Sequence, residues 1–153
     1  MPRATIGIGS NLGDPEASVR AALGALERLG RVVRTSSLYR TKPWGIEAQP
    51  EFVNAVAQLE TQLEPHELLT ALKDLERALG RRPGKRWGPR AIDFDILSYD
   101  DRRLDDPELV IPHPRMRERA FVLVPLAEID PSFRDALERL DPRERAGVRR
   151  LGG

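Results

Sequence analysis

Residues 86–97 read Arg86-Trp87-Gly88-Pro89-Arg90-Ala91-Ile92-Asp93-Phe94-Asp95-Ile96-Leu97. In the second half of this stretch apolar residues alternate with two aspartates, which is the period-two pattern of a strand with one buried face. Asp93 and Asp95 should therefore leave the same side of the strand, with their Cα atoms roughly 7 Å apart. Two like charges at this separation repel each other, so a site that keeps both ionised normally holds a cation or a donor-rich partner between them.

A basic segment broken by glycine and proline precedes this strand. Its cations are Arg81, Arg82, Lys85, Arg86 and Arg90, and Trp87 stands among them. Carboxylates that hold Mg²⁺, together with such cations, suit a polyphosphate, and Trp87 could cover an edge of the site. A solvated strand face and a solubilising patch would use the same residue types. For an isolated Asp-x-Asp, a solvated strand face is the favoured interpretation. Here the two aspartates, the basic segment and Trp87 occur together within residues 81–95, and this makes metal and phosphate chemistry an equal alternative.

Length and composition favour one globular domain over residues 1–153. The chain is 40% hydrophobic and 32% charged, which suits a single core. A net charge of +1 provides no overall field that would recruit nucleic acid or a membrane. The absence of cysteine excludes disulfides and thiolate catalysis and fits the reducing cytoplasm, where we expect the protein as a monomer or weak dimer. The first residues lack the apolar run of a signal peptide, and no stretch approaches a membrane span.

Hydrophobic periodicity predicts the element order β-α-β-β-α-β, followed by a late helix. The expected strands lie at residues 3–9, 31–39, 52–61 and 92–97, and the expected helices at 14–30, 65–79 and 119–129. A tight turn at residues 98–103 is expected to lead into a short edge strand, and residues 109–112 to form another extended piece. In the peripheral segment, 131–153, one or two short surface helices are expected at residues 135–140 and 142–147. This order is that of a ferredoxin-like α+β sandwich, an antiparallel sheet with helices packed mainly on one face. The other face of such a sheet is free for a ligand.

Two further features have competing interpretations. Gly7-Ile8-Gly9 resembles part of a dinucleotide-binding fingerprint, but the third glycine is out of register and no acid closes the next strand. Close approach of neighbouring groups at a strand end explains these glycines better.

The segment at residues 41–50 is long and proline-rich, and loops of this kind are usually functional or disordered. Trp44 favours a lid there, with a tryptophan packed on its own strand as the alternative.

The stretch at residues 86–97 is similar to the signature of the 6-hydroxymethyl-7,8-dihydropterin pyrophosphokinase family, which acts in folate biosynthesis. More segments resemble this family, in the family's order over roughly residues 1–130: Gly9–Asp14, Ser37–Pro43, Gln49–Ala55, Ile111–Met116 and Arg119–Leu123. The resemblance implies the ferredoxin-like fold. It also implies transfer of pyrophosphate from ATP to the hydroxymethyl group of the reduced pterin, with release of AMP.

The resemblance also implies roles for single residues at the phosphate site. Asp93 and Asp95 match the pair that binds two Mg²⁺ ions, which bridge the ATP phosphates. Arg82 and Arg90 match cations that neutralise the triphosphate in catalysis, with Arg81 as the alternative to Arg82. The other residues assigned to ATP are Glu76, Trp87, His113 and Arg119.

A second group of residues matches the pterin site of the family. Phe52 and Phe121 match two aromatic rings that sandwich the flat heterocycle, a role suited to a polarisable plane. The groups that match readers of its polar edge are Asn54 and the segment Thr41, Lys42, Pro43 and Trp44.

Several of these residues also have a plainer interpretation when taken singly. Glu76 stands near the C-terminal end of its helix, where the dipole disfavours an acid, and could be a surface charge paired with Arg77 or Arg81. His113 could be a turn histidine between two prolines, and the two phenylalanines could be core residues. The other histidine, His66, keeps the plain interpretation because it stands at the exposed start of a helix.

Two other functions are compatible with this type of fold. A nucleic-acid-binding module is one, since ferredoxin-like sheets with aromatic residues also stack bases. It requires a ribonucleoprotein aromatic signature and a net basic face, and the sequence has neither. A non-catalytic nucleotide- or anion-binding module on the same scaffold is the other, and only activity distinguishes it from the enzyme.

Overall fold

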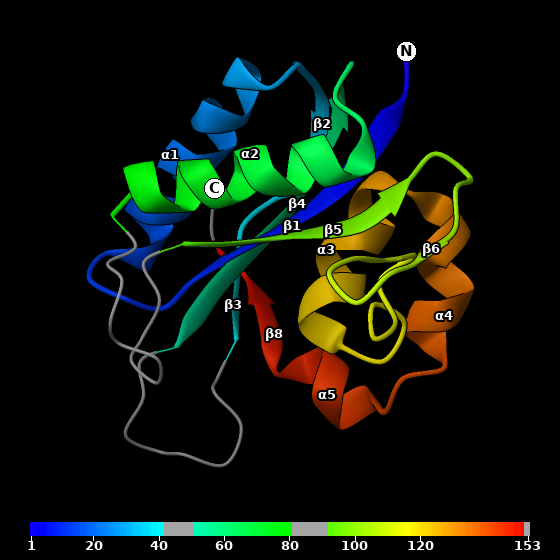
Figure 1. The fold of residues 1–153 in the computed structure, drawn as a ribbon. Helices are drawn as coiled ribbons and strands as arrows, with labels where there is room; N and C mark the ends of the chain where they lie inside the picture. The colour runs from blue at the N-terminus through cyan, green and yellow to red at the C-terminus, as the bar shows by residue number, and fades with distance from the viewer. Residues whose placement is uncertain (42–50, 81–91, 152–153) are drawn as a thin grey trace.

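Two long neighbouring strands, β1 (Arg3–Ser10) and β4 (Phe52–Glu60), form the centre of the sheet. The computed structural model describes residues 1–41, 51–80 and 92–151, and in these ranges the sheet runs in the order β5-β1-β4-β3-β8, with β2 also paired to β4 (Figure 1). The pairings are antiparallel. The other strands are β2 (Arg31–Thr35), β3 (Tyr39–Thr41), β5 (Asp93–Tyr99) and β8 (Val148–Arg150). The α+β class and the central position of β4 are confirmed.

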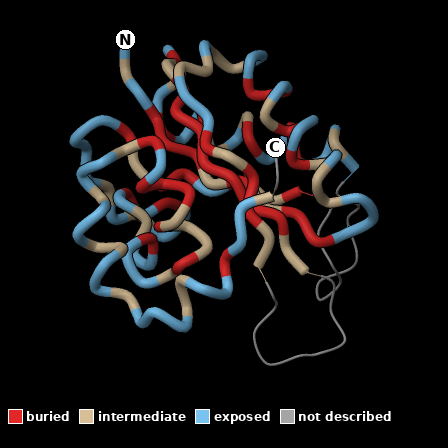
Figure 2. Tube along the Cα trace, turned by 180° about the vertical axis from the view of Figure 1, so that it is seen from behind, coloured by how far each residue is buried: buried red, intermediate tan, exposed pale blue. Residues whose placement is uncertain are grey.

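Helices α1 (Pro15–Ala25) and α2 (Pro65–Ala78) lie on one face of the sheet (Figure 1). As the sequence predicts, Asp14 caps α1 by accepting a hydrogen bond from the Ala17 amide. A capping box between Glu64 and Glu67 starts α2, and the 3-10 turn Leu26–Arg28 extends α1. The apolar sides of both helices meet the even-numbered residues of β1, so this face is filled by core side chains. Figure 2 shows the buried residues concentrated along the strands.

Helix α3 (Ala120–Ile129) lies on the opposite face of the sheet (Figure 1). Its residues Leu123 and Leu126 are fully buried and pack with Val56 of β4 and Leu97 of β5 in a second apolar cluster. This helix covers part of that face, and the rest remains open for the pocket described below. Among the described helices, none is long and apolar enough to cross a bilayer.

The structure corrects the sequence prediction in two places. The strand expected at residues 31–39 is two strands, because Ser36 interrupts the ladder: its Oγ accepts from the Val56 amide while its own amide donates to Val56 O. The tail contains the two predicted short helices, α4 (Arg134–Glu138) and α5 (Pro142–Ala146), and also a 3-10 turn that was not predicted, η2 (Pro131–Phe133). It also contains β8, which was not predicted because three residues carry too little periodicity. The predicted extended pieces form a small hairpin of β6 (Leu104–Asp105) and β7 (Val110–Ile111).

A polar cluster joins α3 to the start of β3. The Glu128 carboxylate accepts hydrogen bonds from the Ser37 amide at 3.0 Å, the Ser37 hydroxyl at 2.9 Å and the Tyr39 hydroxyl. Burial favours the neutral form of Glu128, but the hydrogen bonds from Tyr39 and Ser37 outweigh burial and hold the pKa of Glu128 below its ordinary value. Burial, reinforced by the Glu128 hydrogen bond, raises the pKa of Tyr39, so the hydroxyl remains a donor at neutral pH.

This cluster predicts an acid-dependent stability difference between the wild type and Glu128→Gln. A lowered pKa stabilises the folded state above the ordinary glutamate pKa of 4.5, and this contribution is lost as the pH falls through the folded-state pKa. We expect the advantage of the wild type in urea unfolding to shrink from about pH 6 to pH 3, and to stay below about 1 kcal/mol because Glu128 is exposed. Glu138→Gln, an exposed glutamate on α4, is the control. A wild-type advantage that stays constant over this range would contradict the prediction.

Candidate functional site

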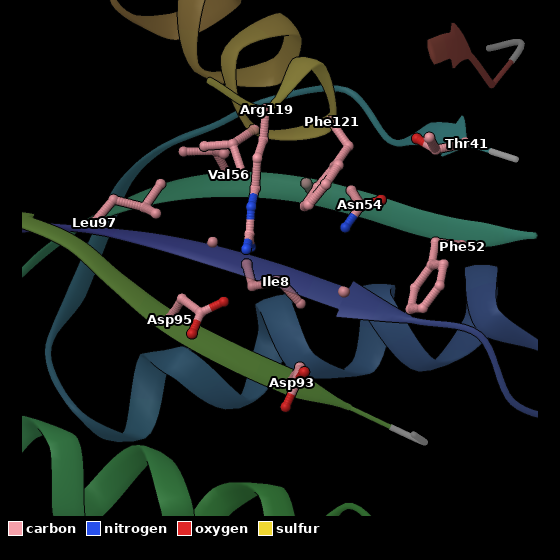
Figure 3. Close-up of a pocket in the computed structure, with 14 residues that line it drawn as sticks. Ile8, Thr41, Phe52, Asn54, Val56, Asp93, Asp95, Leu97, Arg119 and Phe121 are labelled. Atoms are coloured by element: carbon pink, nitrogen blue, oxygen red, sulfur yellow. The ribbon is translucent and has the colours of Figure 1, made fainter. Parts of the chain in front are cut away.

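A pocket of about 230 Å³ lies on the face of the sheet opposite α1 and α2, beside the first turn of α3 (Figure 3). Strands β1, β4 and β5 form its floor, and the chain around Arg119 and Phe121 forms one wall. Its volume suits a small flat ring system rather than a whole nucleotide. The lining combines aromatic rings with carboxylate, amide and guanidinium groups, which is the composition of a site that orients a polar ligand.

The two aspartates of β5 enter this pocket from the same side of the strand (Figure 3). Asp93 pairs with Gly9 of β1, and Asp95 pairs with Gly7. Because the glycines have no side chains, β1 places no side chain beside either carboxylate on this face. Phe94, between the aspartates, is 6% exposed and packs in the core on the other face. The predicted common face of the two carboxylates is confirmed.

Gly9 also makes room for Asn54 on the neighbouring strand. The two residues are register partners in β1 and β4, and a Cβ on Gly9 would lie 2.9 Å from Asn54 Nδ2. Asn54 is buried, and its Oδ1 has no hydrogen-bond partner among the described residues; the same holds for Thr41 Oγ1. A buried acceptor without a donor is costly. Since both residues line the pocket, a ligand with N–H groups would relieve this cost.

Two aromatic rings flank Asn54 in the pocket. Phe52 stands at the start of β4, and Phe121 stands in the first turn of α3 (Figure 3). The Arg119 guanidinium lies 5.6 Å from the centre of the Phe121 ring, within the range of a cation–π contact. Arg119 extends from the N-terminal end of α3 across the pocket toward β1 and the neighbouring strand β5, which carries the aspartates (Figure 3). One wall therefore carries both an aromatic surface and a cation.

Glu76 is not the surface charge that its helix position suggested. Its side chain is buried, the residue is 4% exposed, and Oε2 accepts a hydrogen bond of 2.8 Å from the Phe94 amide. Arg77, the partner considered for it, pairs with Asp74 instead. The sequence did carry a signal for this burial, because Glu76 follows Leu72 by four residues and Leu68 by eight, on the apolar stripe of α2.

The other predicted site residues are less directly connected with the pocket. His113 follows β7; its amide donates to Leu97 O at 2.9 Å, and its Nδ1 accepts from the Arg115 amide at 3.2 Å. Neither His113 nor Glu76 is part of the pocket lining. The remaining predicted residues lie outside the described ranges: Lys42, Pro43, Trp44, Arg81, Arg82, Trp87 and Arg90.

The donor set of the pocket suits a cation shared with a ligand. In the described part of the chain, no group of three or more histidine, aspartate or glutamate side chains could enclose a metal ion. Asp93 and Asp95 provide two carboxylates on one face. Mg²⁺ is commonly bound by one or two carboxylates, with water and substrate phosphate oxygens completing its shell. The residues present therefore fit Mg²⁺ bound together with a phosphate ester.

Comparisons with known proteins agree on one family. Residues 5–131 match the family model of 7,8-dihydro-6-hydroxymethylpterin-pyrophosphokinase (HPPK). The chain is 47% identical to 2-amino-4-hydroxy-6-hydroxymethyldihydropteridine pyrophosphokinase of Methylorubrum extorquens, over 99% of each chain. It is 48% identical to the protein of that name from Pseudomonas aeruginosa, over 88% of this chain and 84% of the relative.

Solved structures agree on the fold. The crystal structure of wild-type Plasmodium falciparum HPPK-DHPS superposes with a TM-score of 0.73 at 16% identity, covering 90% of this chain and 41% of that one. The triple-mutant protein with STZ-DHP gives a TM-score of 0.71 at 14% identity and is covered over 43% of its length. The chain thus spans less than half of these structures, and the likeness concerns the fold alone.

The contact at Gly9 predicts that Gly9→Ala turns the Asn54 side chain away from the pocket floor. A carbon at 2.9 Å from Nδ2 cannot be accommodated unless the asparagine rotates. Because only the end of one side chain must move, the free energy of unfolding should change by about 1 kcal/mol or less. A crystal structure of the variant and urea unfolding measure the two effects.

Gly7→Ala is the matched control on the same strand. Its Cβ would lie 3.6 Å from Leu97, which is an ordinary contact, so Asn54 should stay in place. An unchanged Asn54 rotamer in Gly9→Ala would show that the prediction is wrong.

Proposed function

The chain belongs to the 7,8-dihydro-6-hydroxymethylpterin-pyrophosphokinase family, and we propose that it transfers pyrophosphate from ATP to the hydroxymethyl group of 6-hydroxymethyl-7,8-dihydropterin, releasing AMP, in folate biosynthesis. The observation that carries this proposal is a single pocket in which Asp93 and Asp95, on one strand face, lie beside Asn54 and two aromatic rings. This arrangement provides a place for a flat polar heterocycle next to a place for phosphates.

The pterin would lie between Phe52 and Phe121, with its polar edge toward β3 and β4. Its N–H groups would donate to Asn54 Oδ1 and Thr41 Oγ1, the two buried acceptors without described partners. Stacking between two rings favours a flat polarisable ligand. The amide and hydroxyl restrict which edge of the heterocycle can enter. The segment Lys42, Pro43 and Trp44 would complete this site.

The phosphates of ATP would lie at the aspartate end of the pocket. Asp93 and Asp95 would hold Mg²⁺, as two ions; when bound, these ions neutralise phosphate charge and keep the attacking and leaving oxygens in line. Arg119 reaches into the same region from α3 and would contact a phosphate as a guanidinium fork. The other residues proposed to contact ATP are Arg82, Trp87, Arg90 and His113. Glu76 is also proposed for the ATP site, but because it is buried and outside the pocket lining it would act there indirectly.

The reaction itself needs positioning more than a covalent intermediate. The pterin hydroxyl oxygen forms a bond to the β-phosphorus of ATP, the bond from that phosphorus to the bridging oxygen of the α-phosphate breaks, and the hydroxyl proton is lost. Arg82 and Arg90 would stabilise the charge that develops on the phosphates. Arg119 contacts Phe121, so a group that orders the pterin ring also fixes a cation near the reacting phosphates.

The partners that this reaction requires are small molecules, ATP and the reduced pterin. We propose that the enzyme works on them as a monomer or weak dimer in the cytoplasm, which the cysteine-free sequence fits.

Formation of AMP from ATP tests the proposal directly. We expect AMP only when 6-hydroxymethyl-7,8-dihydropterin and Mg²⁺ are both present, and no AMP with chelator added. Binding of both ligands without AMP formation would identify a non-catalytic nucleotide-binding module instead. The absence of both binding and turnover would overturn the proposed function altogether.

Asp95→Ala tests the role of the carboxylate pair. We expect turnover to fall by about two to three orders of magnitude. ATP should still bind weakly through the arginines proposed to contact its phosphates. Steady-state kinetics and calorimetry with an ATP analogue measure the two effects. Asp105→Ala removes an exposed carboxylate from β6 and should leave both unchanged. Wild-type turnover in Asp95→Ala would remove the metal assignment.

Asn54→Ala tests the pterin site separately from the phosphate site. Loss of one hydrogen-bonding group should raise the KM for the pterin about tenfold, with a much smaller change in the KM for ATP. Gln58→Ala is a matched control, because Gln58 is another buried amide on β4 whose Oε1 has no partner among the described residues, but it is not part of the pocket lining. Equal effects on both KM values in Asn54→Ala would contradict the assignment.

A further inference from the structure

Glu76 is an acid in a place that disfavours acids. It stands two residues before the last residue of α2 (Pro65–Ala78), where the partial negative charge of the helix dipole opposes a carboxylate. It is also buried, at 4% exposure, and removing a carboxylate from water is costly unless hydrogen bonds compensate. The groups that Glu76 contacts therefore indicate why an acid is kept at this position.

One of these contacts joins α2 to the edge of the sheet between the two aspartates. Glu76 Oε2 accepts from the Phe94 amide at 2.8 Å. Strand β5 is an outer strand of the main sheet, and β1 pairs with it along its other side. The Phe94 N–H therefore points away from β1, at an edge where the described strands provide no acceptor. The carboxylate replaces the missing neighbouring strand at this one position.

The hydrogen bond has a direct geometric consequence for the pocket. Asp93 and Asp95 flank Phe94, and all three residues share consecutive peptide planes. The ladder with β1 holds these planes on one side of the strand and the fixed Phe94 amide holds them on the other; together they set the direction in which both aspartate side chains leave the strand. The buried Phe94 side chain anchors the strand from the core side, but a side chain alone does not fix the rotation of the adjoining peptide groups.

We propose that Glu76 is a positioning residue for Asp93 and Asp95: its buried carboxylate holds the Phe94 amide and so keeps both aspartates directed into the pocket. The inference rests on the proposed function, because it assigns the aspartates a shared ion. Glu76 acts through the backbone of β5, since it is not part of the pocket lining.

The first test measures the hydrogen bond without any assay of activity. Amide hydrogen exchange of Phe94, followed by NMR, should be slow in the wild type although this N–H points out of the β1 ladder. Glu76→Ala should speed the exchange about tenfold or more, the factor expected from losing roughly 1.4 kcal/mol. Glu76→Gln keeps an oxygen acceptor at the same place and should retain most of the protection.

The second test separates positioning from general stability. Glu76→Ala should lower kcat and raise the Mg²⁺ concentration for half-maximal rate by about 10- to 100-fold, the usual effect of removing a group that orients metal ligands. The KM for the pterin should change less than about twofold, and Glu76→Gln should restore most of the activity. Leu75→Ala, the neighbouring buried position on α2, should destabilise the fold by about 2–5 kcal/mol and leave kcat and the Mg²⁺ dependence unchanged where it is folded.

Four results would each overturn the inference. Two concern the hydrogen bond and its effect: fast exchange of the Phe94 amide in the wild type, or an unchanged kcat and Mg²⁺ dependence in folded Glu76→Ala. The other two concern the comparison variants: a Glu76→Gln variant as impaired as Glu76→Ala, or the same kinetic changes in Leu75→Ala. If Glu76→Ala does not fold, the inference is still tested by the exchange rate of the Phe94 amide in the wild type and by the exchange and kinetics of Glu76→Gln. A wild type that forms no AMP would overturn the proposed function alone, because the Phe94 exchange and Mg²⁺ binding with an ATP analogue remain measurable.

Discussion

The register of β1 between β4 and β5 determines where the polar groups of the pocket lie. Gly9 pairs with Asn54 on one side and Asp93 on the other, and Gly7 pairs with Asp95. A shift of one residue would turn each strand's buried set to the wrong face, and would carry the aspartates into the helix layer. Burial of the even-numbered residues of β1 under α1 and α2 resists such a shift. Core packing on one face thus fixes the site on the other.

The fold and half of the site were predictable from the sequence, for identifiable reasons. Acidic and apolar residues alternate regularly in β5, with Asp93 and Asp95 at odd positions and apolar residues at even positions. The common face of the two aspartates could therefore be predicted from the residue types alone. The surface-charge alternative for Glu76 was wrong because it took a charged residue to be exposed, although the spacing from Leu68 and Leu72 placed Glu76 on the apolar stripe. Strand β8 and the break at Ser36 depend on tertiary contacts, which no local pattern contains. The roles of the matched residues still rest on the family resemblance.

The two faces of the sheet divide the work of the proposed reaction. The helix layer of α1 and α2 supplies rigidity, and the opposite face supplies chemistry: carboxylates from β5, an amide from β4 and the Arg119–Phe121 wall from α3. The groups proposed to read the pterin and hold the metal stand on paired strands. Such placement suits a reaction that depends on holding two substrates in line, because strands in a ladder vary little in position.

The Glu76–Phe94 hydrogen bond also joins the two elements that precede and follow a segment with proposed ATP contacts. Residues 81–91 connect the end of α2 to the start of β5, and this bond joins residues 18 positions apart on either side of them. The segment includes Arg82, Trp87 and Arg90, which the family resemblance assigns to ATP. A single buried acid therefore joins the last turn of α2 to the strand that carries both carboxylates.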